Sequence, residues 1–215
     1  MAEYRKSYSQ VGEDLLVAFF LQKERGVSYI DIGCLWPTRL SNTYFFYKRG
    51  GEGLCVDPNP DIRAEYETAR PRDTFVNLGV GATTGKLTYH RFQNPVFNTF
   101  LPERAAAVQA TGRRGRNAIG SVEVPVRPLS KLLRDLDWRE RVGERVDFLS
   151  LDVEGLEHDV LSSLDFTYIR PRLIVLETAV TERAPENNAC VALLRERGYE
   201  LTGWTGHDAF LMDRG

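Results

Sequence analysis

Two short apolar segments, each with an acid at or near its end, constrain the fold of this chain more than any other feature. Tyr29–Ile32 includes Asp31 and runs into Gly33, and Gly53–Val56 runs into Asp57. Loop residues follow both segments, which is typical of parallel strands whose carboxyl ends face a ligand. Asp57 follows Gly33 in the sequence by roughly 20 residues. This is the spacing at which α/β domains carry an acid that binds the ribose of a nucleotide. The pair therefore predicts a site for a nucleoside-bearing cofactor.

Strands and helices alternate along the rest of the chain. Besides the first two strands, apolar segments predict strands at 74–80, 86–92, 122–127, 146–152, 172–177, 199–204 and 208–212. Helices are expected within 10–26, 41–50, 61–69, 103–110, 130–136, 154–164 and 185–197. The first of these helices is expected to be capped by Ser9 and to end near Gly26. This order predicts an α/β fold with a mostly parallel sheet, one antiparallel member in a C-terminal hairpin, and a small inserted hairpin around 81–92.

The chain has 215 residues, enough to bury a sizeable core, and is predicted to form one domain over 1–215. Four parts are expected within it. An N-terminal helix occupies 7–26, a cofactor-binding half 27–92, a variable region 93–121, and the second half of the sheet 122–215. The variable region is irregular and is expected to contact the acceptor as a lid.

The charge balance argues against a nucleic-acid partner. A net charge of −2 and a pI of about 6.0 give no overall field that attracts nucleic acid or an anionic membrane. Arg113, Arg114 and Arg116 lie together between glycines. This loop is open to three interpretations: an anion-binding lid, a nucleic-acid patch, or a solvated loop. The solvated loop is favoured, because arginines between glycines need no ligand.

The sequence also favours a cytoplasmic location. The first ten residues lack the apolar core of a signal peptide, and the longest apolar run, 15–21, covers about a third of the length that a bilayer span requires. Cys34, Cys55 and Cys190 have neither disulfide-framework nor zinc-site spacing. Cys34 and Cys55 fall in or next to predicted buried strands, so they are expected to be reduced core thiols.

The glycine pattern narrows the cofactor. A dinucleotide site needs G-x-G-x-x-G after the first strand, but Gly33 stands alone there, and no phosphate-binding G-x-x-x-x-G-K-[ST] occurs. The glycines of 79–85 have the wrong spacing and follow the third strand, so they are interpreted as turn residues. S-adenosylmethionine suits the pattern better, because it has a ribose but no phosphates. Its cationic groups favour nearby carboxylates, and Asp152 at the end of 146–152 is placed to supply one.

Five motifs occur in an order that resembles a known family. They are Ser-Gln-x-Gly-Glu-Asp at 9–14, Asp-Ile-Gly at 31–33, Ser-Asn-Thr at 41–43, Asp-Pro-Asn-Pro at 57–60, and Leu-Ser-x-Asp-Val-Glu-Gly-x-Glu at 149–157. Together they resemble the FkbM-type methyltransferases over roughly 7–212. The resemblance implies a class I methyltransferase (Rossmann-like) fold, a three-layer sandwich around a seven-stranded sheet. It also implies S-adenosylmethionine as the methyl donor and, usually, oxygen methylation of sugars or natural products.

The resemblance further implies where the cofactor binds. Carried over by position, the cofactor-binding residues are Gln10, Asp31, Gly33, Asn42, Asp57, Asn77 and Asp152. Asn77 is expected near the adenine. Family members often carry a further glycine near position 37, where this chain has Trp36-Pro37, so the path of the loop after Gly33 is expected to differ.

The candidates for catalysis follow the strand at 146–152. Methyl transfer to oxygen needs the acceptor held in line, and a general base helps to remove the hydroxyl proton. Asp152, Glu154 and His158 form the best cluster, with Glu154 and His158 four residues apart and therefore expected on one face of a helix. Structural roles remain open for all three: a helix N-cap, first-turn dipole complementation, and a plain surface position. Two acids and a histidine are too common a combination to predict a metal site.

The sequence therefore predicts an S-adenosylmethionine-dependent O-methyltransferase acting on a small hydroxylated acceptor, a saccharide or a secondary metabolite. A cofactor-binding module without catalysis is the alternative, and a nucleotide-dependent oxidoreductase is a weaker one. Neither a nucleic-acid partner nor a membrane span is predicted. The sequence makes no prediction of which compound is the acceptor, of the methylated position, or of the oligomeric state.

Overall fold

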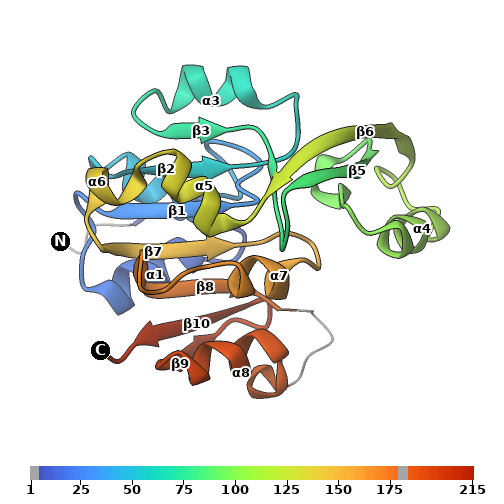
Figure 1. The fold of residues 1–215 in the computed structure, drawn as a ribbon. Helices are drawn as coiled ribbons and strands as arrows, with labels where there is room; N and C mark the ends of the chain where they lie inside the picture. The colour runs from blue at the N-terminus through green and yellow to red at the C-terminus, as the bar shows by residue number, and fades with distance from the viewer. Residues whose placement is uncertain (1–4, 179–183) are drawn as a thin grey trace.

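A seven-stranded sheet crosses the molecule in the computed structural model, which describes residues 5–178 and 184–215 (Figure 1). The strands lie in the order β3-β2-β1-β7-β8-β10-β9. Their bounds are β1 Ser28–Ile32, β2 Glu52–Val56, β3 Thr74–Val76, β7 Arg145–Leu151, β8 Arg170–Glu177, β9 Tyr199–Trp204 and β10 Asp208–Asp213. β10 pairs antiparallel with both β8 and β9, and the other pairs are parallel. The predicted sheet, with one antiparallel member in a C-terminal hairpin, is confirmed.

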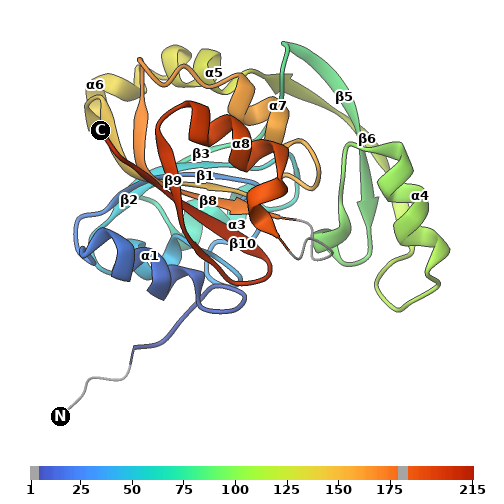
Figure 2. The ribbon, with the colours of Figure 1, turned by 90° about the horizontal axis from the view of Figure 1, so that it is seen from below.

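Helices cover both faces of this sheet, which gives three layers (Figure 2). One face carries α1 Glu13–Leu21, α2 Tyr44–Tyr47 and α3 Arg63–Ala69, whose apolar side chains pack against Tyr29, Phe148 and Phe210. The other face carries α5 Leu129–Asp135, α6 Trp138–Val142, α7 Glu157–Ser162 and α8 Ala189–Glu196, with the short η2 Pro185–Asn187 before α8. Because side chains alternate along each strand, Ile30 and Ile32 face this second layer while Asp31 faces the first. Cys34 and Cys55 are buried in the first layer, as predicted.

A second, three-stranded sheet projects beyond the carboxyl ends of the main strands (Figure 1). It consists of β4 Gly79–Val80, β5 Gly85–Phe92 and β6 Ala118–Arg127 in the order β4-β6-β5, with η1 Pro95–Phe97 and α4 Pro102–Ala110 between β5 and β6. The prediction of one strand at 74–80 was wrong, because Asn77 and Leu78 separate β3 in the large sheet from β4 in the small one. The predicted hairpin is also different: β5 pairs with β6 rather than with the strand just before it.

Three predicted helices differ from the structure at their ends. The N-cap of α1 is Gly12, with φ +103°, and not Ser9, although the Ser9 hydroxyl still accepts a hydrogen bond from the Asp14 amide. α1 ends at Leu21 rather than near Gly26, because Gln22 adopts a left-handed conformation. α2 is a single turn rather than the predicted 41–50. α7 begins only at Glu157, which leaves 154–156 outside the helix.

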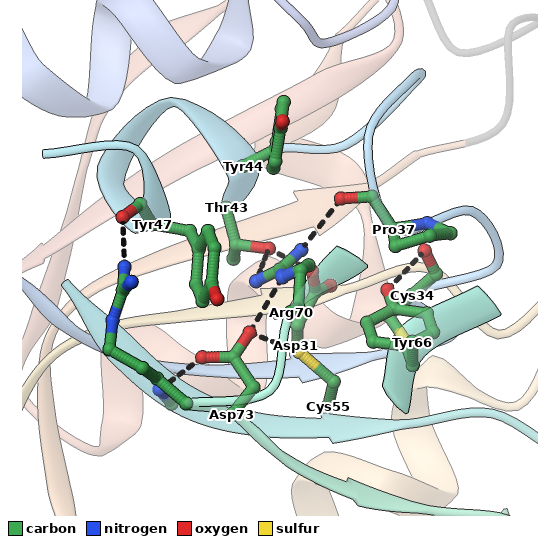
Figure 3. Close-up of polar contacts among 12 residues, drawn as sticks. Asp31, Cys34, Pro37, Thr43, Tyr44, Tyr47, Cys55, Tyr66, Arg70 and Asp73 are labelled. Atoms are coloured by element: carbon green, nitrogen blue, oxygen red, sulfur yellow. Dashed lines mark hydrogen bonds and ion pairs between the residues drawn. The ribbon is translucent and has the colours of Figure 1, made fainter. Parts of the chain in front are cut away.

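A buried arginine links the first three strands to the loops at their ends (Figure 3). Arg70, at the end of α3, pairs with Asp73 at 2.6 Å, and both side chains are fully buried. The guanidinium also donates to Thr43 Oγ1 at 3.0 Å and to the Tyr29 hydroxyl at 3.1 Å. Thr43 in turn donates to Asp31 at 2.6 Å. A charge this deeply buried needs several partners, and Arg70 has them on β1, on the loop before α2 and on the loop before β3.

This network makes a prediction about stability. Arg70→Leu removes the cation and leaves the Asp73 carboxylate buried without a counter-charge, so the free energy of unfolding in urea should fall by about 3–5 kcal/mol. Arg63→Leu is the matched control on the same helix, because Arg63 is half exposed and pairs with Glu67 at the surface. Its cost should stay below about 1 kcal/mol. Equal losses for the two variants would contradict the role given to Arg70.

Candidate active site

A pocket opens where β1, β2 and β7 end, and the small sheet forms its far wall. It encloses about 800 Å³ of empty space, part of which is open to solvent. The strand ends contribute Gly33, Asp57 and Asp152, and the loop after β1 contributes Leu35 and Leu40. Tyr89 of β5 and the segment that follows it complete the opposite wall, with Pro95, Val96, Asn98, Thr99 and Phe100. A mostly apolar pocket with a few acids on one side can hold a flat ring system at one end and a polar group at the other.

Gly33 lets the three strand ends come together. It has φ +81°, and a Cβ built on it would lie 1.6 Å from the backbone oxygen of Asp152. Its amide donates to Val56 O at 2.9 Å, and the Asp152 amide donates to Ile32 O at 3.0 Å. Only glycine combines this conformation with this close approach. The single predicted glycine is therefore the point at which β1 contacts the ends of both neighbouring strands.

Asp57 lies at the end of β2, in the pocket wall and 3% exposed. Its two carboxylate oxygens accept from the Leu35 and Asn59 amides, each at 2.8 Å. Burial raises the pKa of Asp57 to about 6, although these two hydrogen bonds act to lower it. Each oxygen keeps a second lone pair, so the carboxylate can still accept the hydroxyl protons of a diol.

Three predicted cofactor residues are absent from the residues that line the pocket. Asp31 is 4% exposed and lies behind the lining, where burial raises its pKa to about 6 and Thr43 acts in the opposite direction. Asn42 donates to Ser150 Oγ at 3.1 Å, which ties the loop before α2 to β7. Asn77 donates to the backbone oxygens of Asp57 and Asn59, both at 2.8 Å. In this structure all three support neighbouring pocket residues from behind or from the side.

Gln10 does line the pocket, together with Gly33, Asp57 and Asp152. The segment that carries it is held by Asp14, whose carboxylate accepts from the Ser7 and Ser9 hydroxyls and from the Tyr8 amide. The Tyr8 carbonyl accepts from the Ser41 amide at 2.9 Å, which joins this segment to the loop before α2. The motif at 9–14 thus brings Gln10 to the pocket.

A row of acids continues from Asp152 across the carboxyl ends of the neighbouring strands. Leu151 of β7 pairs with Leu176 of β8, so Asp152 and Glu177 are the next residues along two adjacent parallel strands. Glu177 pairs in turn with Asp208 at the start of β10. Residues in register on adjacent strands point to the same face, so the three carboxyl groups lie side by side on the α1 face. Glu177 and Asp208 were not predicted, because the order and register of the strands are needed to bring them beside Asp152.

Glu154 and His158 do not share a helix face, and this prediction was wrong. Glu154 adopts a left-handed conformation, with φ +57°, before α7 begins. Its carboxylate lines the pocket and forms an ion pair with Arg104 of α4. His158 points to the surface, where its ring contacts the Ser162 hydroxyl at 3.4 Å, and it is absent from the pocket lining. The structure therefore brings Asp152 and Glu154 together and leaves His158 outside.

The acids near Asp152 receive a counter-charge from the chain itself. Carboxyl oxygens of Asp152, Glu154 and Glu177 lie within 4.8 Å of one another. Arg104 neutralises Glu154. Desolvation and the neighbouring Glu177 carboxylate raise the pKa of Asp152 well above its usual range, even though the group is open to the pocket. Two carboxyl groups so close together favour the state in which one of them keeps its proton. The cluster therefore suits proton transfer and the binding of a cation.

The arginine loop lies beside the pocket wall but is absent from the lining. Gly115 O accepts from the Asn94 amide at 2.9 Å, and the Arg116 guanidinium lies 4.5 Å from the centre of the Phe97 ring in η1. Arg113 and Arg114 are exposed.

Among the described residues, every helix is too short or too polar to cross a lipid bilayer.

Comparisons with known proteins give matches in sequence and in fold. The model of the methyltransferase FkbM domain matches residues 26–201. A methyltransferase of Sordaria araneosa, sdnD, is 30% identical over 141 residues, which is 59% of this chain and 54% of that protein. The crystal structure of a methyltransferase FkbM from Methylobacillus flagellatus has a TM-score of 0.51 at 12% identity and covers 87% of this chain and 44% of its own. This chain thus spans about half the length of these two relatives. The fold predicted from the sequence, that of class I methyltransferases, is confirmed.

The close approach at Gly33 makes a prediction about stability. Gly33→Ala should lower the free energy of unfolding by the cost of a left-handed alanine, about 1 kcal/mol, and by about 3 kcal/mol more for the contact with Asp152. Gly50→Ala is a matched control, because Gly50 has the same φ of +81° and a Cβ at that position would have nothing within 4 Å. Urea denaturation of both variants measures the difference. A Gly33→Ala variant no less stable than Gly50→Ala would contradict the close approach, whereas one that fails to fold beside a folded Gly50→Ala would support it.

Proposed function

The chain belongs to the FkbM methyltransferase family, and we propose that it transfers the methyl group of S-adenosylmethionine to a hydroxyl group of a small acceptor, a saccharide or a secondary metabolite. The observation that carries this proposal is the arrangement of Gly33, Asp57 and Asp152 around one pocket. One acid can bind the ribose and another can attract the cationic end of the cofactor. The class of acceptor and the activity of the whole protein are both proposed.

The two sides of the pocket suit the two ends of this cofactor. Asp57 would accept hydrogen bonds from the ribose hydroxyls, and the apolar side chains of Leu78, Val80 and Val96 would pack against the adenine. Asp152 and Gln10 also line the pocket and would receive the amino acid end. S-adenosylmethionine supplies an activated methyl group, so the task of the chain is to hold the acceptor oxygen in line with it.

The small sheet supplies the surface against which an acceptor would be held. Phe100 and Tyr89 are half-buried or buried side chains in this wall, and Thr99 and Asn98 offer polar groups beside them. Thr99 also donates to Glu154 O, which connects this wall to the acidic side of the pocket. We propose that the segment 93–121 selects the acceptor, since it contributes most of the wall that faces the strand ends.

The alternatives lack comparable support. A nucleotide-dependent oxidoreductase would need a phosphate-binding glycine pattern after β1, where Gly33 stands alone. A cofactor-binding module without catalysis would not need acids beside the methyl position, whereas Asp152 and Glu154 face this pocket. A cytoplasmic location is also proposed, because Cys34 and Cys55 are free thiols buried in the same layer of the core.

Calorimetry tests directly whether the chain binds the proposed cofactor. The purified chain should bind S-adenosylmethionine and its product S-adenosylhomocysteine with dissociation constants below about 1 mM, on the order typical of enzyme substrates. NAD should not bind at the same concentrations. Absence of binding to either sulfur compound by a protein with the circular dichroism of a folded α/β domain would refute the proposal.

Asp57→Asn tests how the cofactor is held. Loss of the carboxylate that accepts the ribose hydroxyls should weaken binding of S-adenosylhomocysteine by about 10- to 100-fold. Asp61→Asn is the control, because Asp61 lies on the same loop with its side chain mostly exposed and paired with Arg91. It should change the dissociation constant by less than about twofold. Equal effects of the two substitutions would mean that Asp57 does not contact the cofactor.

A further inference from the structure

Glu177 has no role in the proposed function, yet it lies between Asp152 and Asp208 in the row of acids. On one side is Asp152, the residue next to it on β7, and on the other is Asp208, its partner on β10. Beyond Asp208 lies Glu13 at the start of α1, 1% exposed, and its Oε1 has no hydrogen-bond donor among the residues that the structure describes. Four carboxyl groups thus follow one another from the pocket into the protein. Like charges in register on adjacent strands repel each other, so the row cannot hold four full negative charges.

Within residues 5–178 and 184–215, Arg104 is the cation that acts on Asp152 and Glu177. Arg104 of α4 approaches from the small-sheet side and is already paired with Glu154. Glu157 at the start of α7 adds another negative charge near Asp152, and its Oε1 accepts from the Val153 and Gly155 amides. Tyr89 faces Asp152 from β5. Burial and the nearby Glu13 carboxylate raise the pKa of Asp208 to about 8. Among the described groups, bound protons can supply the charge balance that Arg104 does not.

We propose that Asp152 and Glu177 share one proton in the free enzyme, that binding of the cationic methyl donor releases it, and that the emptied pair accepts the proton of the acceptor hydroxyl. This inference rests on the proposed function and adds a positioning residue, Glu177, to it. Asp152 is the group that faces the pocket. Glu177 lies next to Asp152 and acts through it.

The reaction balances with this assignment. The hydroxyl oxygen forms a bond to the methyl carbon while the bond between that carbon and sulfur breaks, and the electron pair of the broken bond stays on sulfur. The hydroxyl proton passes to the ionised Asp152–Glu177 pair. The sulfonium charge has then disappeared, so the pair no longer needs to be fully ionised and can keep the proton until the products leave. The proton state of the pair thus follows the charge of the cofactor.

Glu177 gives the pair its dependence on cofactor charge. Desolvation raises the pKa of Asp152, the adjacent Glu177 carboxylate raises it further, and both effects favour a proton held by the pair in the free enzyme. A positive sulfonium beside the pair favours the ionised state and offsets the repulsion between the two groups. The affinity for S-adenosylmethionine should therefore rise with pH.

Proton counting by calorimetry tests this inference without an acceptor. Titrations with S-adenosylmethionine and with S-adenosylhomocysteine, each in buffers of different ionisation enthalpy, give the number of protons released at about pH 7.5. In the wild type the sulfonium should release about one proton more than the thioether, and the ratio of the two affinities should rise with pH by up to about tenfold per unit. Asp57 contacts both ligands alike, so its titration cancels in the comparison.

Three variants distinguish a specific effect of Glu177 from the general effect of removing a negative charge. Glu177→Gln should abolish the extra proton and make the affinity ratio independent of pH, while S-adenosylhomocysteine binding stays within about threefold of the wild type. Glu177→Asp should restore part of the pH dependence. Glu196→Gln, at an exposed position on α8, should behave as the wild type. An extra proton that persists in a folded Glu177→Gln would overturn the inference, because it would belong to another group.

Two further outcomes are decisive. If the extra proton disappears in EDTA and returns with Mg²⁺, a metal ion rather than a shared proton balances the row, and the inference is wrong. If both sulfur compounds bind equally at every pH and with equal proton counts, the inference fails while the proposed function stands. If neither compound binds, it is the proposed function that fails.

Discussion

The contact between Gly33 and the backbone of Asp152 is the constraint on which the site depends. A side chain at position 33 would overlap the Asp152 carbonyl, so β1 and β7 can end side by side only with glycine there. The Gly33 amide also donates to Val56 at the end of β2. One residue therefore sets the distance between Asp57 and Asp152, the acids that follow β2 and β7 in the pocket wall. The spacing of Asp57 and Asp152 therefore depends on backbone geometry and not on contacts between side chains and a ligand.

Asp31 belongs to a different part of the structure, although its motif suggested a ligand contact. It lies on the α1 face, where Thr43 donates to it and Arg70 lies beyond Thr43. Burying an arginine is unfavourable unless several acceptors surround it, and these acceptors come from β1 and from the loops before α2 and β3. The network thus holds the loop after β1 in place from behind. Asp31 contributes to the shape of the pocket through this scaffold, and its contact with the cofactor stays a prediction.

The sequence predicted the parts of the site that depend on local pattern. Gly33, Asp57 and Asp152 each end an apolar run, and a parallel sheet brings such ends to one edge whatever the order of the strands. Glu154 and His158 were assigned to one helix face because their spacing fits a helix, but a left-handed residue at Glu154 delays the start of α7. Glu177 and Asp208 could not be found in this way. Their proximity to Asp152 depends on the register of β8 and β10, and that register is set by packing across the whole sheet.

The pocket has an acidic wall and an opposite wall, and the two walls come from different sheets. The acids come from the carboxyl ends of strands in the large sheet, whose positions are fixed by a core packed on both faces. The opposite wall comes from the small sheet, which joins the domain through β4 and β6 and carries the irregular segment between β5 and β6. If that segment selects the acceptor as proposed, changes in it would alter which acceptor fits without moving Gly33, Asp57 or Asp152. Because Asp152 and Glu177 lie at the carboxyl ends of β7 and β8, the pair proposed to accept the proton is separated in the fold from the surface proposed to select the acceptor.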